Sequence, residues 1–376
     1  MSRGRWTPSL NWRAAALLGL ITSTFSTLVS TLAATRIGRD AVVDWMVVAN
    51  IPLRDPALQI HPSPGVILAG ILFHQWADFS WAIVFFGLLG RWTAGLRPQV
   101  ILLVALPWSV FTSASEWLFL VPVLPFAQPV FTLQQVYWIG FTVHAVSASL
   151  YPLFPGLRDR LASRAPSPHA RFAMAWSGAA VAGLTILAVV SAFGELGREP
   201  PWTGSDPAFD QAFMRRMAAH HSQGVEVARL GAERARDPHL RALARLMAAS
   251  QESETRVFGH WWRSWFHGAL PPSTHADHMT MPGMLSPAQI ASLRTAPPDE
   301  FDPLFVSLMS FHHRGAIAMA DQALDDASDL RLKAMAHSIR HEQSGEIALM
   351  HGAGPDLGSV RVAVNAMLGG PPPDGR

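Results

Sequence analysis

Long apolar runs occupy the first half of the chain and are nearly absent after residue 195. The first is an uncharged run from Ala14 to Thr35, which follows three arginines and is long enough to cross a bilayer core of about 30 Å. It also resembles a signal peptide, but its length and the runs that follow it favour an uncleaved helix. Four more runs lie at residues 65–90, 100–124, 130–154 and 172–194. The pattern predicts a transmembrane helical domain of about five spans over residues 1–195.

The placement of arginine predicts the orientation of these spans. If the amino terminus is cytoplasmic, nine arginines lie in inner segments and three in outer segments, as the positive-inside rule expects. The inner ones are Arg3, Arg5, Arg13, Arg91, Arg97, Arg158, Arg160, Arg164 and Arg171, and the outer ones are Arg36, Arg39 and Arg54. Five spans then place everything after residue 195 on the extracytoplasmic side of the cytoplasmic membrane.

Apolar positions after residue 207 keep the spacing of amphipathic helices. Residues 196–207 are rich in Pro and Gly, which is typical of a linker. Helices are predicted at about 207–230, 238–265, 301–324 and 329–351. Phe213, Gln251 and Glu254 of the first pair recur 92 positions later, as Phe305, Gln343 and Glu346. We therefore predict an all-α chain in which two duplicated helical hairpins form a four-helix bundle over residues 208–352, followed by a disordered tail at 353–376.

A methionine stands three residues before a histidine pair in the first helix of each hairpin. The two copies are Met217 with His220 and His221, and Met309 with His312 and His313. Positions i, i+3 and i+4 share one face of a helix, so each copy presents a thioether and two imidazoles together. These groups favour soft or borderline metals, copper above all. A single histidine pair is more often a polar helix face, but the repetition at a constant offset favours metal ligands.

A loop rich in His and Met separates the two hairpins. Its candidate ligands are His275, His278, Met279, Met281 and Met284. A stripe of methionines on a helix is usually core packing. No helical period runs through the Pro-Gly pair inside this loop, so packing explains it poorly. The loop is therefore a second predicted metal-binding segment.

Composition narrows the chemistry further. The chain has no cysteine, which excludes disulfides, thiolate zinc sites and iron–sulfur clusters. Twelve of the 16 histidines and 11 of the 14 methionines follow residue 200. Soft-metal binding must therefore use Met and His, and we predict copper, as Cu(I) or Cu(II). The formal net charge of +2 and the lack of a nucleic-acid motif leave metal ions and the lipid bilayer as the expected partners.

Ionisable residues also occur inside the predicted spans. His74 and Asp78 lie in the second span, Glu116 in the third and His144 in the fourth. Such residues are costly in a bilayer and indicate a function by default. They predict a polar path for a metal ion or a proton, and His74 with His144 could ligate a haem. The alternative is that the four groups hydrogen-bond one another inside the helix bundle.

The residues described so far resemble the bacterial family called domain of unknown function 305, over about residues 206–352. The resemblance rests on FMRRMAAHHSQGVEVA, FDPLFVSLMSFHHRGAIAMA and the loop HMTMPGM. It implies a ferritin-like fold and a periplasmic copper-binding protein linked to copper tolerance. It implicates as ligands Met217, His220, His221, His278, Met281, Met284, Met309, His312 and His313. Met319 is a further candidate, although Val227 occupies the matching position of the first copy. The membrane half resembles no family we recognise.

Two other functions remain open at the level of sequence. The first is a ferritin-like oxidase, but the helices lack the Glu-x-x-His repeats that build di-iron sites. The second is a helical sensor or partner-binding module on a membrane anchor, in which the histidines have no metal role. We expect a membrane-anchored copper-binding protein that sequesters copper, confers tolerance or hands the ion over.

Overall fold

The structure, a computed structural model, describes residues 8–165, 168–201, 207–279 and 281–373. Within these ranges the chain is helical and contains no strand, so the all-α prediction is confirmed. The chain divides into two compact units, each built from three separate segments. Unit 1 comprises Met1–Leu32, Ile71–Trp117 and Trp138–Val189, and unit 2 comprises Ala33–Gly70, Leu118–Tyr137 and Val190–Arg376.

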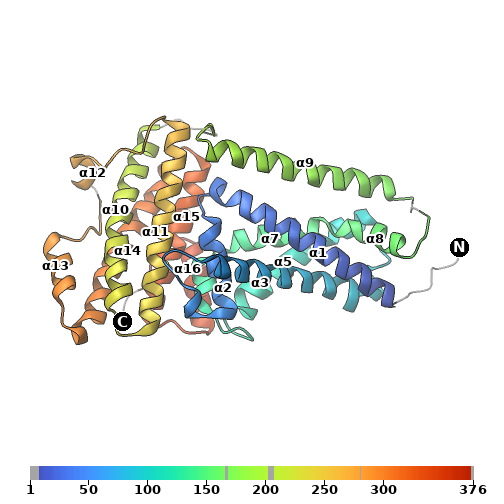
Figure 1. The fold of residues 1–376 in the computed structure, drawn as a ribbon, viewed down its shortest axis with the longest axis horizontal. Helices are drawn as coiled ribbons and strands as arrows, with labels where there is room; N and C mark the ends of the chain where they lie inside the picture. Colours follow the sequence, from blue (N-terminus) through green and yellow to red (C-terminus); the bar gives the residue numbers. More distant parts are fainter. Residues whose placement is uncertain (1–7, 166–167, 202–206, 280, 374–376) are drawn as a thin grey trace. The chain divides into compact units, whose positions relative to one another are not determined.

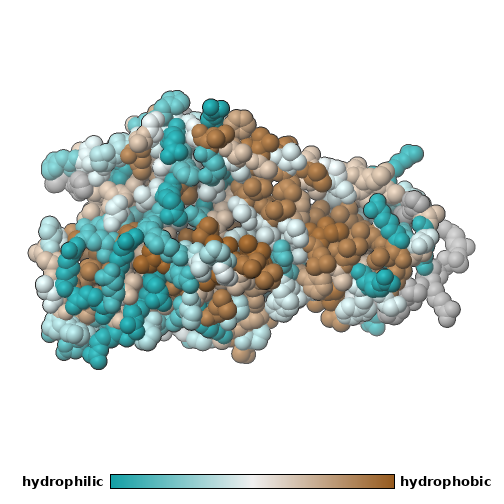
Figure 2. Space-filling model, in the orientation of Figure 1, coloured by the Kyte–Doolittle hydropathy of each residue, from teal (hydrophilic) through white to brown (hydrophobic). Residues whose placement is uncertain are grey.

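Long apolar helices make up unit 1. They are α1 (Pro8–Ala33), α3 (Pro64–Ile83), α5 (Pro98–Ser115) and α9 (Ala170–Glu195), with α7 (Tyr137–Ser149) and α8 (Phe154–Leu161) between the last two (Figure 1). In the part of the chain that the structure describes, four helical stretches are long and apolar enough to cross a membrane: Ser9–Ile37, Pro64–Leu88, Pro98–Leu120 and Ala170–Glu195. Their leucines include strongly exposed ones, such as Leu103 at 75%. Figure 2 shows hydrophobic residues gathered over these helices.

The fourth predicted span, residues 130–154, is not one helix. It is divided into α6 (Pro129–Gln134), which belongs to unit 2, and α7, which belongs to unit 1. The break falls at Gln135, whose backbone is extended. After α7 the helical backbone continues through a 3-10 turn at Tyr151–Leu153 into α8. The helical run in unit 1 is therefore 137–161, later than the sequence pattern predicts.

One apolar cluster ties together one end of unit 1. It contains Leu18 from α1, Phe86 after α3, Ile101 from α5 and Phe154 from α8. Leu18 and Ile101 lie in the first halves of their helices, whereas Phe86 follows the end of α3 and Phe154 follows α7. Successive helices therefore run in opposite directions through this unit.

Four long helices form the larger part of unit 2. They are α10 (Pro207–Arg234), α11 (Pro238–Trp265), α14 (Pro298–Asp326) and α15 (Leu330–Met350). α10 packs on α11 and α14, and α15 packs on α14 and α11 (Figure 1). The shorter α12 (His275–Met279) and α13 (Pro287–Thr295) lie in the connection between the hairpins. α16 (Leu357–Met367) packs on α15, inside the segment predicted to be disordered.

Reciprocal helix caps join the two hairpins. The carboxylate of Asp210, on α10, accepts hydrogen bonds from the backbone N–H groups of Ser328 and Asp329. That of Asp302, on α14, accepts from Arg236 and Asp237 at the start of α11. Each acceptor and each donor pair is displaced by the same 92 positions. The first helix of each hairpin thus caps the second helix of the other.

Two segments from the amino-terminal half complete unit 2. The first holds a 3-10 turn (Ala34–Ile37), α2 (Ala41–Leu53) and a second 3-10 turn (Asp55–Ala57), and the second holds α6. Arg39 pairs with Glu342 of α15 and with Asp44. Arg36 pairs with Glu199, which also receives a 2.6 Å ion pair from Arg331. These ion pairs are buried, and nothing in the sequence pattern predicts them.

Candidate metal centre

The two histidine pairs meet in the middle of unit 2. His220 and His221 come from α10, His312 and His313 come from α14, and none of the four has an exposed side chain. The rings of His220 and His312 lie 3.8 Å apart, measured between centroids. The helical spacing predicted that each methionine and the histidines three and four residues after it share a face, and the packing of α10 on α14 brings His220 and His312 together.

Each outer histidine faces a glutamate on the second helix of its own hairpin. Nε2 of His313 makes a 2.7 Å hydrogen bond with Oε2 of Glu346 on α15. Nε2 of His221 lies 2.6 Å from Oε2 of Glu254 on α11, but without the alignment of a hydrogen bond. A carboxylate that accepts from one ring nitrogen orients the imidazole and leaves the other nitrogen as a lone-pair donor.

The loop between the hairpins closes over the inner histidines. The carbonyl oxygen of Pro282 lies 3.2 Å from Nε2 of His220. Gly283 has a φ of +76°, and a Cβ there would lie 2.7 Å from the Cα of Gly315 on α14. Both the backbone conformation and the close approach require glycine. The Met-Pro-Gly-Met loop therefore covers the site by direct backbone packing.

Unpaired nitrogens point to a ligand at this place. Nδ1 of all four histidines is buried without a hydrogen-bond partner among the described residues, as are both amide atoms of Gln251 and Gln343. Buried polar groups are almost always satisfied in native proteins, so a cluster of them indicates a role beyond packing. A metal ion would use the imidazole lone pairs.

Burial keeps the inner imidazoles neutral. Desolvation, together with the neighbouring histidines, lowers the pKa of His220 to about 3, and it lowers that of His312 well below the usual value. Neutral imidazole is the form that binds a metal. Behind the site, burial raises the pKa of Glu342 well above its usual range; Arg39 opposes this, and Glu254 and Glu346 add to it.

The methionine candidates fall into two groups. Met217, Met281 and Met319 are buried in one apolar cluster, against which the partly buried Met284 packs. Met309 is also buried but is not part of that cluster. Of the remaining loop candidates, His275 is exposed, whereas the side chains of His278 and Met279 lie outside the described residues. In the described part of the chain, no three His, Asp or Glu side chains are grouped closely enough to hold an ion by themselves.

The polar residues of the spans form two hydrogen-bonded groups within unit 1. Asp78 accepts from Ser26, whose hydroxyl also lies 3.0 Å from Nε2 of His74. His144 contacts Glu116 at 3.2 Å through Nε2 and Thr112 at 3.0 Å through Nδ1. Both ring nitrogens of His144 are thus engaged. This arrangement fits hydrogen bonding inside the helix bundle better than an axial haem ligand.

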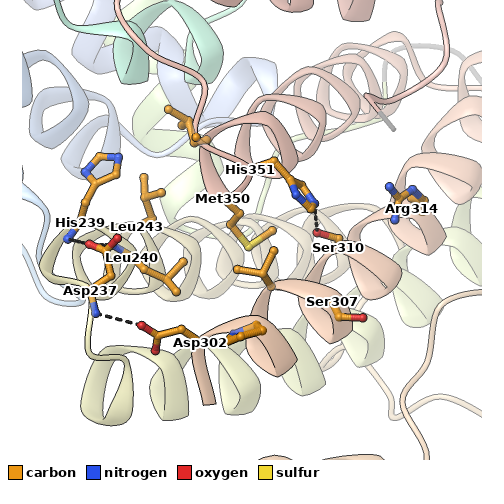
Figure 3. Close-up of a pocket in the computed structure, with 14 residues that line it drawn as sticks. Asp237, His239, Leu240, Leu243, Asp302, Ser307, Ser310, Arg314, Met350 and His351 are labelled. Carbon is orange, nitrogen blue, oxygen red and sulfur yellow. Dashed lines mark hydrogen bonds between the residues drawn. The ribbon is translucent and has the colours of Figure 1, made fainter. Parts of the chain in front are cut away.

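A separate cavity of about 650 Å³ opens beside the ends of α11, α14 and α15 (Figure 3). His351 contacts the Ser310 hydroxyl there at 3.3 Å. The carboxylates of Asp237 and Asp302 in its wall accept hydrogen bonds from backbone N–H groups. They are therefore occupied as helix caps. None of the predicted ligands lines this cavity.

Sequence reasoning missed several residues around the histidines. Glu254 and Glu346 already stood out by their constant offset, and their distance from the histidines along the chain hid the pairing. Gln134 donates a 3.1 Å hydrogen bond from Nε2 to Oε1 of Glu346. Neither Gln134 nor Arg39 belongs to the repeat, so no signal in the sequence connects them with the site.

Comparisons with known proteins match the part of the chain that holds this site. Residues 210–353 match the family described as Domain of unknown function (DUF305). A DUF305 fragment from Deinococcus radiodurans is 30% identical, with 39% of this chain and 94% of that chain covered and a TM-score of 0.35. CopM in its Cu(I)-bound form is 28% identical, with 38% and 91% covered and a TM-score of 0.32. CopM in its Cu(II)-bound form is 29% identical, with 38% of this chain and 92% of that chain covered and a TM-score of 0.33. No curated protein sequence matches the chain.

Proposed function

We propose that this chain, whose residues 210–353 belong to the DUF305 family, is a membrane-anchored copper-binding protein that sequesters copper or hands it over outside the cytoplasm. The observation that supports copper binding most directly is the buried histidine quartet with its four unpaired Nδ1 atoms. Buried Met217 and Met309 stand one helical turn before the two pairs. Imidazole and thioether together match a soft or borderline ion.

The mixed ligand set suits both oxidation states of copper. Thioether sulfur favours Cu(I), and neutral imidazole accepts Cu(I) and Cu(II). The family relative CopM is named in a Cu(I)-bound and a Cu(II)-bound form, which agrees with this assignment. The described residues do not preassemble three His, Asp or Glu ligands. The proposed sites therefore include methionine sulfur, with the ferritin-like bundle as their frame.

We further propose that the bundle lies on the extracytoplasmic side. Besides the four long apolar helices, the helical run 137–161 in unit 1 has the length of another crossing. Arg158 at its end donates to the carbonyl of Ala94, in the connection that precedes α5. The arginine-rich connections thus meet at one end of unit 1, as the positive-inside rule requires for cytoplasmic loops. Five crossings then export residues 196–376.

Copper binding is tested on the full-length protein in detergent. Wild-type protein titrated with copper, after removal of bound metal, retains the ion above zero stoichiometry. Replacing His220 and His312 with Asn lowers the stoichiometry or the affinity, because two of the unpaired ring nitrogens disappear. His267→Asn is the matched control, since His267 is exposed and its φ of 63° is one that Asn also tolerates. A folded wild type that retains no copper contradicts the proposal.

The oxidase reading has one observation in its favour. Glu342 is close enough to Glu254 and Glu346 for their charges to interact, so the bundle holds more carboxylate than its sequence pattern indicates. Iron in the purified protein together with oxygen consumption would support this function instead. If the protein is a scaffold without metal chemistry, cells that carry the double His→Asn variant should tolerate copper as well as cells that carry the wild type.

A further inference from the structure

A short helix from the amino-terminal half docks on the helix that carries Glu346. α6 lies against α15 so closely that a Cβ at Gly345 would clash with the carbonyl oxygen of Leu133. One turn earlier, Nε2 of His341 lies 3.1 Å from the carbonyl oxygen of Thr132. One residue later, Gln134 donates to Glu346. α6 thus reaches the candidate metal centre from outside residues 210–353.

The two hairpins differ at the positions that receive this helix. His341, Glu342 and Gly345 contact α6 or Arg39. The matching positions of the first hairpin hold Ala249, Ser250 and Ser253, none of which could make the same contacts. The neighbouring Gln251 and Glu254 are unchanged in the second hairpin, where they are Gln343 and Glu346. The repeat has therefore diverged at the docking positions while the residues that face the histidines stayed the same.

The histidine–glutamate pair of the second hairpin is also held by more hydrogen bonds than that of the first. Both oxygens of Glu346 are engaged, one by Gln134 and one by His313 in an aligned hydrogen bond. Glu254 approaches His221 at a similar distance but without that alignment. Among the described residues, no side-chain donor corresponding to Gln134 reaches Glu254. A carboxylate held at both oxygens has less freedom to turn, so it fixes the imidazole more firmly.

We propose that Gln134 is a positioning residue of the candidate metal centre, which holds Glu346 so that Nδ1 of His313 is presented to the metal. In this arrangement Nε2 of His313 donates to Glu346, and the buried, unpaired Nδ1 keeps its lone pair. Each half of the centre then binds an ion of its own, and the His313 half binds it more tightly than the His221 half does. This inference rests on the proposed copper binding and adds a residue of the membrane-anchored half to its site.

Arg39 supports the same arrangement by pairing with Glu342, which lies on α15 one turn before Glu346. Its guanidinium pairs with Glu342, a carboxylate buried near Glu346 and Glu254. An unpaired buried carboxylate at that point would repel Glu346. Neutralising Glu342 leaves Glu346 free to serve His313.

Copper binding by full-length protein in detergent tests the proposal. The Gln134→Leu variant keeps the size of the side chain and removes the donor. We expect one of two binding steps to weaken by about 10- to 100-fold, as is usual when a partner of a ligating histidine loses its support. The other step stays unchanged. Arg256→Gln is the control, because it breaks the 2.9 Å ion pair with Asp40 in the same unit, away from α15. Equal weakening of both steps, or no change, overturns the proposal.

A second measurement needs no metal. Thermal unfolding of the metal-free protein is compared for Gln134→Leu, Glu346→Gln and the double variant. If the two residues are coupled, the double variant loses less thermal stability than the sum of the losses of the two single variants. Strictly additive losses overturn the positioning role. If the wild type binds no copper, the proposed function fails, and this cycle alone decides whether Gln134 holds Glu346. If copper binds normally in all variants, only the positioning role fails.

Discussion

At the scale of single residues, the sequence pattern identified the groups that the fold brings together, but not how they are paired. The offset of 92 positions selected His220, His312 and their neighbours, and these meet at a ring distance of 3.8 Å. The offset could not identify Gln134 or Arg39, because these residues lie outside the repeated segments and have no counterpart 92 positions away. Local spacing predicts which side chains share a face, whereas the partner of that face is set by tertiary packing.

Acid should destabilise the protein through its neutral histidines. The pKa of His220 is about 3 in the folded chain and that of His312 is well below the usual value, against about 6.5 when unfolded. Below pH 6.5 the unfolded chain takes up protons that the folded chain refuses, so stability is complete above that pH and falls toward pH 3. At pH 5 the loss is about 2 kcal/mol for His220, and His312 adds to it in the same direction.

The unfolding midpoint of the metal-free protein in detergent, measured at pH 7.5 and pH 5, checks this expectation. The His220→Asn and His312→Asn double variant should lose less stability between these two pH values than the wild type does. A midpoint for the wild type that rises on acidification would contradict it.

At the scale of elements, the predicted helix ranges agree with the structure except where the backbone breaks within an apolar run or where a short helix was not expected. The four long helices of the bundle follow from apolar periodicity and are found close to the predicted ranges. The prediction of one span over the apolar run 130–154 was wrong, because hydropathy alone does not reveal the extended backbone at Gln135 that separates α6 from α7. The expected tail disorder also missed α16, whose Val360 and Ala363 are buried although its sequence is short and rich in small residues.

The reciprocal caps should contribute to the stability of the bundle. Asp210→Ala and Asp302→Ala each remove the acceptor for two backbone N–H groups at the start of a helix in the other hairpin. Each substitution should lower the free energy of unfolding by about 0.5–2 kcal/mol. Thermal unfolding measures the loss, with Asp299→Ala as the control, since Asp299 is exposed in the first turn of α14. An Asp210→Ala variant as stable as the control would show that the cap is dispensable.

At the scale of the whole molecule, the absence of cysteine makes orientation directly measurable. A single cysteine can be introduced into a chain that has none and labelled with a maleimide that does not cross membranes. Ala288 in α13 and Ala165 after α8 are both exposed. We expect Ala288→Cys to react in intact spheroplasts and Ala165→Cys to react only after permeabilisation. The reverse pattern would place the bundle in the cytoplasm and contradict the extracytoplasmic assignment.

The burial of α15 has a consequence for the order in which the protein is made. From Ser338 to Leu349 every residue of this helix is buried, so it is covered on all sides, partly by α6 and by the segment before α2 that contains Arg39. Those covering segments leave the ribosome long before α15 does. They are linked in sequence to the apolar helices, so if those helices insert into a membrane as proposed, the covering segments are held in place only after insertion. Under the proposed function, newly made chains therefore complete the candidate metal centre last, and a chain that does not enter the membrane has no complete centre with which to bind the metal.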